Sequence, residues 1–382
     1  MNFFEKNKQK WIVGGVILGL LLLAAGLGIF SYFYGNRCYR QYQVQSKVDR
    51  SDSNNVKYMY YEGNILKYSR SGISEIGNTG KSLWNGGYEM KQPQVDVCGD
   101  YVVVADVAGK QFYVYNGEDE GTSIETSLPI VRAKVARQGV VAVLLQDKDS
   151  NVLNIYNPYS NAESLLVEIP TNVAEEGYPL DFDISPDGKS VVTSYLVVKG
   201  SSIETKISFY NFTEVGKDNN TLVGGKSFGE KMIAKVEFID DDKVAVFHEK
   251  GFSIFGQMKQ PENLVEKNFS EEIKSIAFQN GYLAVVLEKD GEIENQKLVL
   301  YDEKGKEKLQ RNISYEYANM EIHGEEIIFT GNRSCNILRF NGHDKFEYKF
   351  EQEIDALYPT SDGEVYTLID TSTIQKIKLK TK

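Results

Sequence analysis

The longest apolar segment of the chain is residues 11–34, a run of 24 residues without Asp, Glu, Lys or Arg. At a rise of about 1.5 Å per residue, a helix of this length exceeds the ~30 Å hydrocarbon core of a bilayer. Trp11 stands at one end and Tyr32–Tyr34 at the other, where aromatic rings settle at headgroup level. A cleaved signal peptide would have a shorter apolar core followed by small residues. The pattern therefore predicts one N-terminal transmembrane helix.

The charges that flank this run decide its orientation only weakly. Basic residues lie close to both ends: Lys6, Lys8 and Lys10 before the run, and Arg37, Arg40 and Lys47 after it. The free N-terminal amine tips the balance of the positive-inside rule toward a cytoplasmic N-terminus. We therefore expect residues 1–10 to form a short basic cytoplasmic tail and the large C-terminal domain to lie outside the cytoplasm, in a single-pass cell-membrane protein.

Beyond residue 55 the pattern changes to short alternating or wholly apolar runs, rich in Val, Ile, Tyr and Phe and separated by turn residues. This pattern is typical of β-strands. One element, a turn residue followed closely by an apolar strand, recurs through the chain. It begins at Gly63, Gly99, Gly139, Gly188, Asp241, Gly281, Gly324 and Gly363. The mean spacing of about 43 residues falls within the range of β-propeller blades.

Other strands accompany this element in a fixed order. An apolar strand precedes the turn, and a short alternating strand follows the element and ends at a turn residue: Asn116, Asn157, Asn211, Gly256, Asp302 and Asn341. With a weaker fourth strand, each repeat makes a four-stranded blade. The sequence thus predicts an all-β fold, a β-propeller of four-stranded blades over residues 56–382, with an array of two-sheet sandwiches as the alternative.

The last repeat has room for three strands before Lys382. A propeller leaves no open edge if a segment from the other terminus supplies the missing strand. Residues 39–48 (YRQYQVQSKV), within the juxtamembrane segment 35–55, are placed to do this. We therefore predict eight blades closed by the N-terminal segment, with seven blades as the alternative.

Composition narrows the class of partner. The net charge of −11 argues against nucleic acid, because affinity for nucleic acid depends on neutralising phosphates. Three cysteines give no disulfide framework and are expected to be free thiols. Gly15 and Gly19 form a G-x-x-x-G pattern through which two membrane helices could pair, although glycine is common in membrane helices generally. A homodimer through these glycines is therefore an open alternative.

Known catalytic and metal-binding motifs are missing from the sequence. The three histidines, His248, His323 and His343, have no partners at zinc-like spacing, and there is no G-x-S-x-G nucleophile motif. The segment from Asp147 resembles the start of a calcium loop but has Val152 and Pro158 where glycine and glutamate are needed. We predict no catalytic residue, no metal and no cofactor.

The central channel offers the best candidate for binding. The polar residue that opens each innermost strand should face a rim of the channel: Gln94, Lys134, Asp181, Lys235, Ser275, Asn319 and Asp355. A mixed ring of this kind suits a peptide or polar ligand. The simpler alternative is that the ends of strands are solvated.

Two segments resemble known propeller repeats. Residues 184–189 (ISPDGK) are similar to the hairpin of bacterial WD-repeat-like propellers, and residues 102–109 followed by 112–115 are similar to a quinoprotein-type blade. The whole chain, with stretches such as PQVDVCGDYVVVAD and KVEFIDDDKVAVF, resembles an uncharacterised family of membrane-anchored propeller-like proteins of Gram-positive bacteria. The resemblance implies fold and location and no activity.

Together these features predict a non-catalytic, membrane-anchored scaffold or sensor that binds a protein, peptide or cell-envelope ligand outside the cytoplasm. The alternative class is a propeller enzyme, either a quinoprotein-like oxidoreductase or a glycan-active enzyme. A glycosidase would require two carboxylates about 5–10 Å apart across a pocket.

Overall fold

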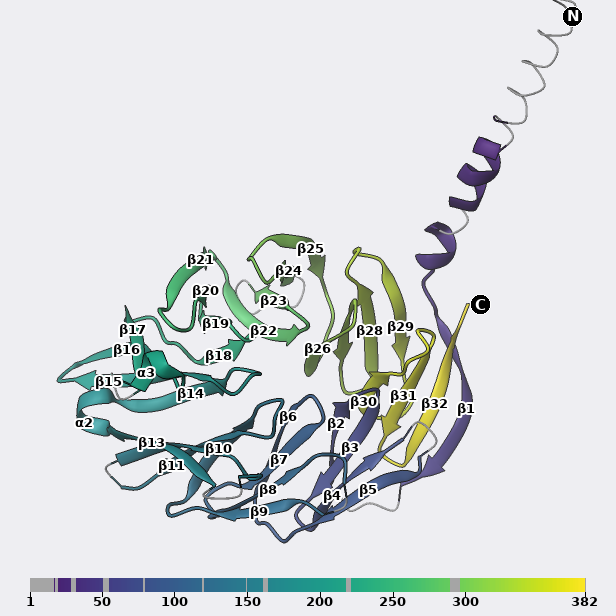
Figure 1. Ribbon diagram of the computed structural model, residues 1–382. Helices are drawn as coiled ribbons and strands as arrows, with labels where there is room; N and C mark the ends of the chain where they lie inside the picture. The colour runs from purple at the N-terminus through teal and green to yellow at the C-terminus, as the bar shows by residue number, and fades with distance from the viewer. Residues whose placement is uncertain are drawn as a thin grey trace, which may run out of the picture.

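The computed structural model describes residues 17, 20–28, 32–50, 55–77, 80–118, 120–148, 150–160, 164–217, 221–288 and 296–381. Within these residues, 32 strands form eight four-stranded antiparallel sheets arranged as a ring (Figure 1). The protein is an eight-bladed β-propeller. This confirms the predicted fold and blade number, and it excludes both the seven-bladed ring and the sandwich array.

The first four blades follow one another along the chain. Blade 1 contains β2 (Lys57–Tyr61), β3 (Asn64–Ser69), β4 (Gly72–Ile76) and β5 (Ser82–Gly87). Blade 2 contains β6 (Pro93–Cys98), β7 (Tyr101–Asp106), β8 (Gln111–Tyr115) and β9 (Thr122–Glu125). Blade 3 contains β10 (Ile130–Val135), β11 (Val141–Gln146), β12 (Ser150–Tyr156) and β13 (Leu165–Asn172). Blade 4 contains β14 (Tyr178–Ile184), β15 (Ser190–Lys199), β16 (Ser202–Asn211) and β17 (Leu222–Gly229), with the short helices α2 (Val173–Glu176) before it and α3 (Glu214–Lys217) within it.

The next three blades repeat the order, and the eighth departs from it. Blade 5 contains β18 (Lys235–Phe238), β19 (Lys243–His248), β20 (Gly251–Gly256) and β21 (Glu262–Asn268). Blade 6 contains β22 (Glu272–Gln279), β23 (Tyr282–Glu288), β24 (Gln296–Asp302) and β25 (Glu307–Ile313). Blade 7 contains β26 (Asn319–His323), β27 (Glu326–Thr330), β28 (Ser334–Arg339) and β29 (Asp344–Lys349). Blade 8 contains β30 (Ile354–Pro359), β31 (Val365–Asp370) and β32 (Thr373–Lys380), and takes its fourth strand, β1 (Gln41–Asp49), from the N-terminal segment.

Burial explains why the second strand of each repeat reads as an apolar run. In β7, the residues from Val102 to Ala105 are fully buried, because neighbouring blades cover both faces of the sheet. The fourth strand lies at the perimeter, where exposed and half-buried residues alternate, as in β9. Aromatic rings pack in the layers between blades: Trp84 of blade 1 stacks on Tyr115 of blade 2 with centroids 5.4 Å apart. The core is thus a ring of layers between blades.

The strand β1 closes the ring as predicted. It runs antiparallel to β32 from the pair Gln41–Lys380 to the pair Asp49–Thr373, with a bulge between Val44 and Ser46. Tyr39, just before β1, bridges instead to Phe346 of blade 7 and is buried between blades 7 and 8. We call β1 the closing strand. It extends one residue beyond the predicted segment, and Tyr39 and Arg40 lie outside it.

The two ends of the strands define two faces of the propeller. The proximal face carries the turns between first and second strands and between third and fourth strands, and the chain enters β1 there. An example is the tight turn Ser185–Gly188, where the Gly188 N–H donates to the Ser185 carbonyl at 2.7 Å and Gly188 has φ +71°. The distal face carries the start of each first strand and the turns between second and third strands.

The helical residues 20–28 and 32–35 lead away from the ring at the start of β1 (Figure 1). No helix in the described part of the chain is both long and apolar enough to cross a membrane. The rest of the apolar run 11–34, including Gly15 and Gly19, lies outside the described residues.

Candidate functional site

Charged side chains cluster on the first strands of blades 2 to 5. On three of these strands two charged residues stand two positions apart, and on β6 Asp96 stands two positions from Gln94. Side chains at this spacing project from one face of the strand. We call this set the charged network: Asp96 of β6, Arg132 and Lys134 of β10, Asp181 and Asp183 of β14, and Lys235 and Glu237 of β18.

Asp181 is the centre of the half of this network that lies nearer the distal face. The residue is 2% exposed, and its carboxylate pairs with Arg132 and lies 3.5 Å from the Lys235 ammonium. Its Oδ2 also accepts the backbone N–H of Val236 at 2.9 Å. Because two cations and a backbone donor surround it, this buried carboxylate is fully satisfied.

Lys134 is the centre of the half nearer the proximal face. Its Nζ lies 3.0 Å from Oδ1 of Asp96 and 3.6 Å from Oδ1 of Asp183. Asp183 is also tied to the next blade, since its Oδ2 accepts the N–H of Phe238 at 2.7 Å. Ion pairs therefore join three neighbouring blades through one lysine.

Burial and neighbouring charges shift the protonation of this cluster. Burial and the charge of Glu237 raise the pKa of Asp183 to about 7, against the opposing effect of Lys134. Burial alone would lower the pKa of Lys134, but Asp96, Asp183 and Glu237 outweigh it and raise that pKa well above its ordinary value. Burial would raise the pKa of Glu237, but the neighbouring lysines lower it. As pH falls, Asp183 therefore takes up a proton before Glu237 does.

The other half of the channel, formed by blades 6, 7, 8 and 1, is built differently. The ring of Tyr60 lies 4.5 Å from that of His323 and 6.0 Å from that of Tyr358. Ser275 and Tyr317 share a hydrogen bond of 2.6 Å between their hydroxyls. Aromatic contacts and hydroxyl hydrogen bonds accompany separate carboxylate contacts here, such as Glu321 with His323 at 3.1 Å and Lys274 with Glu288 at 3.1 Å, instead of one network that joins several blades.

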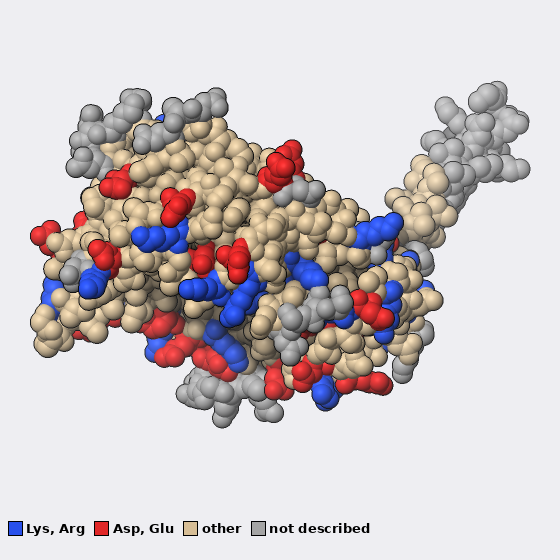
Figure 2. Space-filling model, turned by 90° about the horizontal axis from the view of Figure 1, so that it is seen from below, with Lys and Arg blue, Asp and Glu red and all other residues tan. Residues whose placement is uncertain are grey.

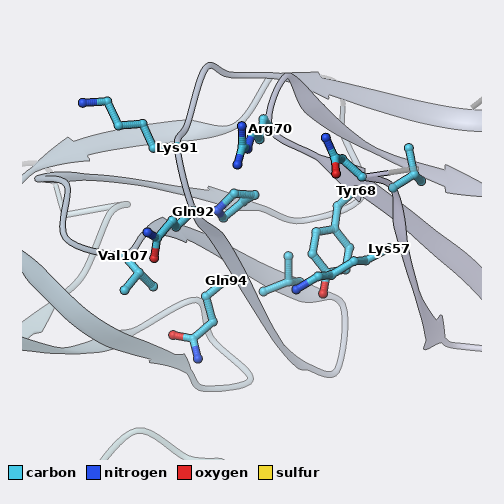
Figure 3. Close-up of a pocket in the computed structure, with 11 residues that line it drawn as sticks. Lys57, Tyr68, Arg70, Lys91, Gln92, Gln94 and Val107 are labelled. Carbon is cyan, nitrogen blue, oxygen red and sulfur yellow. The ribbon is translucent and has the colours of Figure 1, made fainter. Parts of the chain in front are cut away.

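Two cavities open on the distal face beside blade 1. The larger, about 540 Å³, lies between blades 1 and 2, and we call it the blade 1–2 cleft. Lys57, Tyr68, Arg70, Lys91, Gln92 and Gln94 line it (Figure 3). The second, about 460 Å³, lies between blades 8 and 1 and shares Val56, Lys57 and Tyr68 with the first. The two cavities flank the start of β2 and together extend across three blades.

A third cavity, of about 440 Å³, opens on the proximal face over blades 7 and 8. Its floor contains the buried Lys345, which pairs with Glu326, and Tyr366, whose hydroxyl donates to the same carboxylate. Arg37 pairs with Glu364 close by. This cavity therefore lies beside the junction between the N-terminal helix and the ring.

The structure brings together three of the seven predicted rim residues. Lys134, Asp181 and Lys235 belong to the charged network, whereas the other four lie apart from it. Gln94 lines the blade 1–2 cleft, Asp355 pairs with Arg50 in the second cavity, Ser275 bonds Tyr317, and Asn319 is exposed at the start of β26. Their role in binding a ligand stays a prediction.

Sequence reasoning missed the second charged position on each strand, namely Asp96, Arg132, Asp183 and Glu237. The signal was present, because side chains two apart on a strand share a face. The segments QVD, RAK, DFD and KVE each place polar residues at that spacing around an apolar one. The lining of the blade 1–2 cleft left a weaker signal, since Lys57, Arg70 and Lys91 come from a strand, a turn and a connection between blades.

The ring of eight four-stranded blades places this chain among the β-propeller proteins. Among solved structures it is similar to BamB from Moraxella catarrhalis, with TM-score 0.51 and 12% identity over 90% of this chain and 99% of that one. It is also similar to Sqt1 from Chaetomium thermophilum bound to the N-terminus of the ribosomal protein L10, with TM-score 0.56 and 12% identity over 88% of this chain and 100% of that one. At these identities the similarity establishes the fold alone.

The chain belongs to a protein family of unknown function, DUF5711, whose model matches residues 35–379. The match begins just after the apolar run and ends within β32, so it covers the closing strand and all eight blades. No curated protein matches the chain in sequence.

Proposed function

We propose that this protein is a membrane-anchored scaffold that holds a protein or peptide partner outside the cytoplasm on the distal face of its propeller. The observation that carries this proposal is the placement of the cavities. The blade 1–2 cleft and the cavity next to it open on the distal face, whereas residues 32–40 join the ring on the proximal face. An anchor at residues 11–34 would thus leave the distal face turned away from the lipid.

The junction with the helix supports a defined orientation. Asn341 donates a side-chain hydrogen bond to Asn36 at 2.7 Å, and Arg339 donates to the carbonyl of Arg37 at 3.1 Å. The guanidinium of Arg37 lies 3.9 Å from the centroid of the Tyr34 ring. These contacts hold the last turn of the helix against blades 7 and 8, so the ring would not swing freely about the anchor.

A propeller of this size is able to hold a peptide, as Sqt1 does with the N-terminus of L10. Basic and acidic side chains lie interspersed over the face seen in Figure 2, a pattern that suits a protein partner better than a polyanion such as nucleic acid.

The enzyme alternative gains no support from the carboxylates of the channel. Asp181 and Asp183 are engaged by cations and backbone donors, and neither lines any of the three cavities. A glycan-cleaving enzyme needs two carboxylates that face a substrate. Glu325 and Glu326 line the third cavity, where Glu326 is engaged by Lys345 and Tyr366.

In-cell crosslinking tests the scaffold directly. The full chain with a C-terminal affinity tag is crosslinked in intact cells and purified, and a variant in which the propeller is replaced by an unrelated domain behind the same residues 1–35 serves as the control. We expect one or more proteins to be recovered with the full chain and not with the control. Recovery of identical proteins from both would contradict the proposal.

Protease treatment of intact cells tests the orientation. We expect the propeller to be cleaved or released before lysis, because it would lie outside the membrane. A propeller that stays protected until the cells are lysed would place it in the cytoplasm and overturn that part of the proposal.

A further inference from the structure

We propose that the blade 1–2 cleft is the binding site for an acidic, extended peptide segment of the partner. This inference rests on the proposed function and adds the chemistry of what is bound.

The charge of the cleft is opposite to that of the chain. The protein carries a net charge of −11, yet Lys57, Arg70 and Lys91 line the cleft and none of its described lining residues is acidic. None of these three side chains forms an ion pair with a described residue. In the charged network, by contrast, each lysine and arginine pairs with a carboxylate. These cations attract an anionic ligand to the cleft, while the acidic residues of the rest of the protein repel it from other parts of the surface.

The cleft is shaped by fixed backbone. Oδ1 of Asp106 accepts the N–H of Lys91 at 2.9 Å and of Gln92 at 2.8 Å, which holds the connection between blades 1 and 2. The carbonyl of Arg70 accepts the N–H of Met90 at 2.8 Å and ties the turn of blade 1 to the same connection. Figure 3 shows Lys57 and Arg70 converging on the cavity from blade 1, opposite the glutamines. A binding site of this kind requires little ordering when a ligand enters.

The amide groups favour a peptide over a simple polyanion. Gln94 lines the cleft, and its side-chain Oε1 is buried without a hydrogen-bond partner among the described residues. A buried acceptor left unpaired is costly, and a peptide N–H would satisfy it, whereas a phosphate polymer carries no such donor. Gln92 adds a second amide beside it. The cleft thus offers cations that would pair with the carboxylates of an acidic peptide, and side-chain amides that would hydrogen-bond its backbone.

The length of the site fits an extended segment. The second cavity continues past Lys57 and Tyr68 to Tyr58 and Asp355. The guanidinium of Arg50 already pairs with Asp355 and lies 4.8 Å from the Tyr58 ring, so this end is neutralised and aromatic. We therefore place the acidic residues of the peptide in the blade 1–2 cleft and an apolar or neutral residue beside Tyr58.

Selection from a random peptide library identifies the preferred chemistry without knowledge of the partner. The full chain in a non-ionic detergent is presented with phage-displayed octapeptides. We expect the recovered peptides to be enriched in Asp and Glu at two or more positions. The double variant K57Q/R70Q should lose this enrichment, while K259Q/K304Q, which alters two exposed lysines in turns of the proximal face, should keep it.

Affinity measurements with a selected peptide, its Glu-to-Gln and Asp-to-Asn version, and inorganic polyphosphate then separate the alternatives. We expect K57Q/R70Q to weaken the acidic peptide at least tenfold, and Gln94→Leu to weaken the peptide without changing polyphosphate binding. No acidic enrichment, or equal binding by the wild type and K57Q/R70Q, would overturn the proposal. If polyphosphate binds more tightly than the acidic peptide, and Gln94→Leu does not weaken binding of the peptide, the proposal is overturned in favour of a polyanion site.

The same variants distinguish this inference from the scaffold itself. If crosslinking recovers the same partner with the wild type and K57Q/R70Q, the scaffold stands and the cleft is not its site. If neither protein recovers a partner, the proposed function fails.

Discussion

The inner strands of blades 2 to 5 and those of blades 6, 7, 8 and 1 differ in how their polar side chains are paired. In blades 2 to 5, the carboxylates of Asp181 and Asp183 are buried and satisfied by Arg132, Lys134 and Lys235. On the inner strands of blades 6, 7, 8 and 1, tyrosine contacts and hydroxyl hydrogen bonds accompany carboxylate pairs that stay separate from one another. The cations of the blade 1–2 cleft form no ion pair with any residue that the structure describes. A side chain that is already paired has little left to offer a ligand. The comparison therefore assigns a structural role to the charged network, and binding to the cleft at the boundary between the two halves, where blade 1 meets blade 2.

Removing the central cation of the charged network should have the largest effect. Lys134→Met leaves Asp96 and Asp183 without their shared cation, and we expect a loss of about 4 kcal/mol in the free energy of unfolding. The loss should be larger at pH 8 than at pH 5, because Asp183, whose pKa is raised to about 7, is then ionised. Urea denaturation followed by circular dichroism measures it. Lys259→Met, at an exposed turn, is the control, and a loss below about 1 kcal/mol at Lys134 would contradict the structural role assigned to the network.

The closing region of the other half depends on packing, and Tyr39 tests it. This side chain is 4% exposed between blades 7 and 8, and Tyr39→Ala should cost about 3 kcal/mol because a large buried ring is lost. Tyr39→Phe keeps the ring and removes only the hydroxyl, which donates to Glu364 at 2.8 Å and accepts from Nε of Arg37 at 2.6 Å, so it should cost about 1 kcal/mol. Thermal unfolding of both variants measures the difference. Equal losses would show that the hydrogen bond, and not the packing, secures the ring.

A pH titration should separate the halves further, because Asp183 has a raised pKa. Between its ordinary value near 3.8 and about 7, the folded state binds more protons at this carboxyl than the unfolded state, so stability falls as pH rises through that window. Asp183→Asn cannot titrate and keeps an oxygen for the N–H of Phe238. On going from pH 5 to pH 8, the wild type loses stability at this carboxyl and the variant does not. We therefore expect the free energy of unfolding of the variant to rise by about 2 kcal/mol relative to that of the wild type.

Urea denaturation at both pH values gives this difference, and Glu89→Gln, at an exposed position, should leave the slope unchanged. The stabilisation linked to the lowered pKa of Glu237 is lost as pH falls below about 4.5, outside the range measured. A wild-type slope that Asp183→Asn does not alter would mean that other groups govern the pH dependence.

The fold was predictable because its signals are local and repeated. Strands such as β7 are covered on both faces and so become continuous apolar runs, while turns such as Ser185–Gly188 require a glycine at positive φ. The closing strand was predictable from the missing fourth strand of blade 8. The path of Tyr39 was not, because its burial depends on blade 7, which lies some 300 residues away in the chain.

The site was predictable only in part, for a related reason. The residue that opens each inner strand can be read from the sequence, and this found Lys134, Asp181 and Lys235. Whether two of the seven candidates are in contact depends on how neighbouring blades pack against each other. The local sequence of a strand does not indicate this packing. Whether Lys57 and Arg70 are paired likewise depends on their neighbours in space, and none of the described residues forms an ion pair with either of them.

The smallest expected effect sharpens the comparison most, because it applies one substitution to both halves. Lys57→Met makes the same chemical change as Lys134→Met, but Lys57 is exposed and pairs with no carboxylate in the described part of the chain. We expect the free energy of unfolding to change by less than about 0.5 kcal/mol, while affinity for an acidic peptide falls. Urea denaturation and peptide titration on the same preparation measure both. A large loss of stability would mean that Lys57 has a structural partner and that the two halves are held together in the same way.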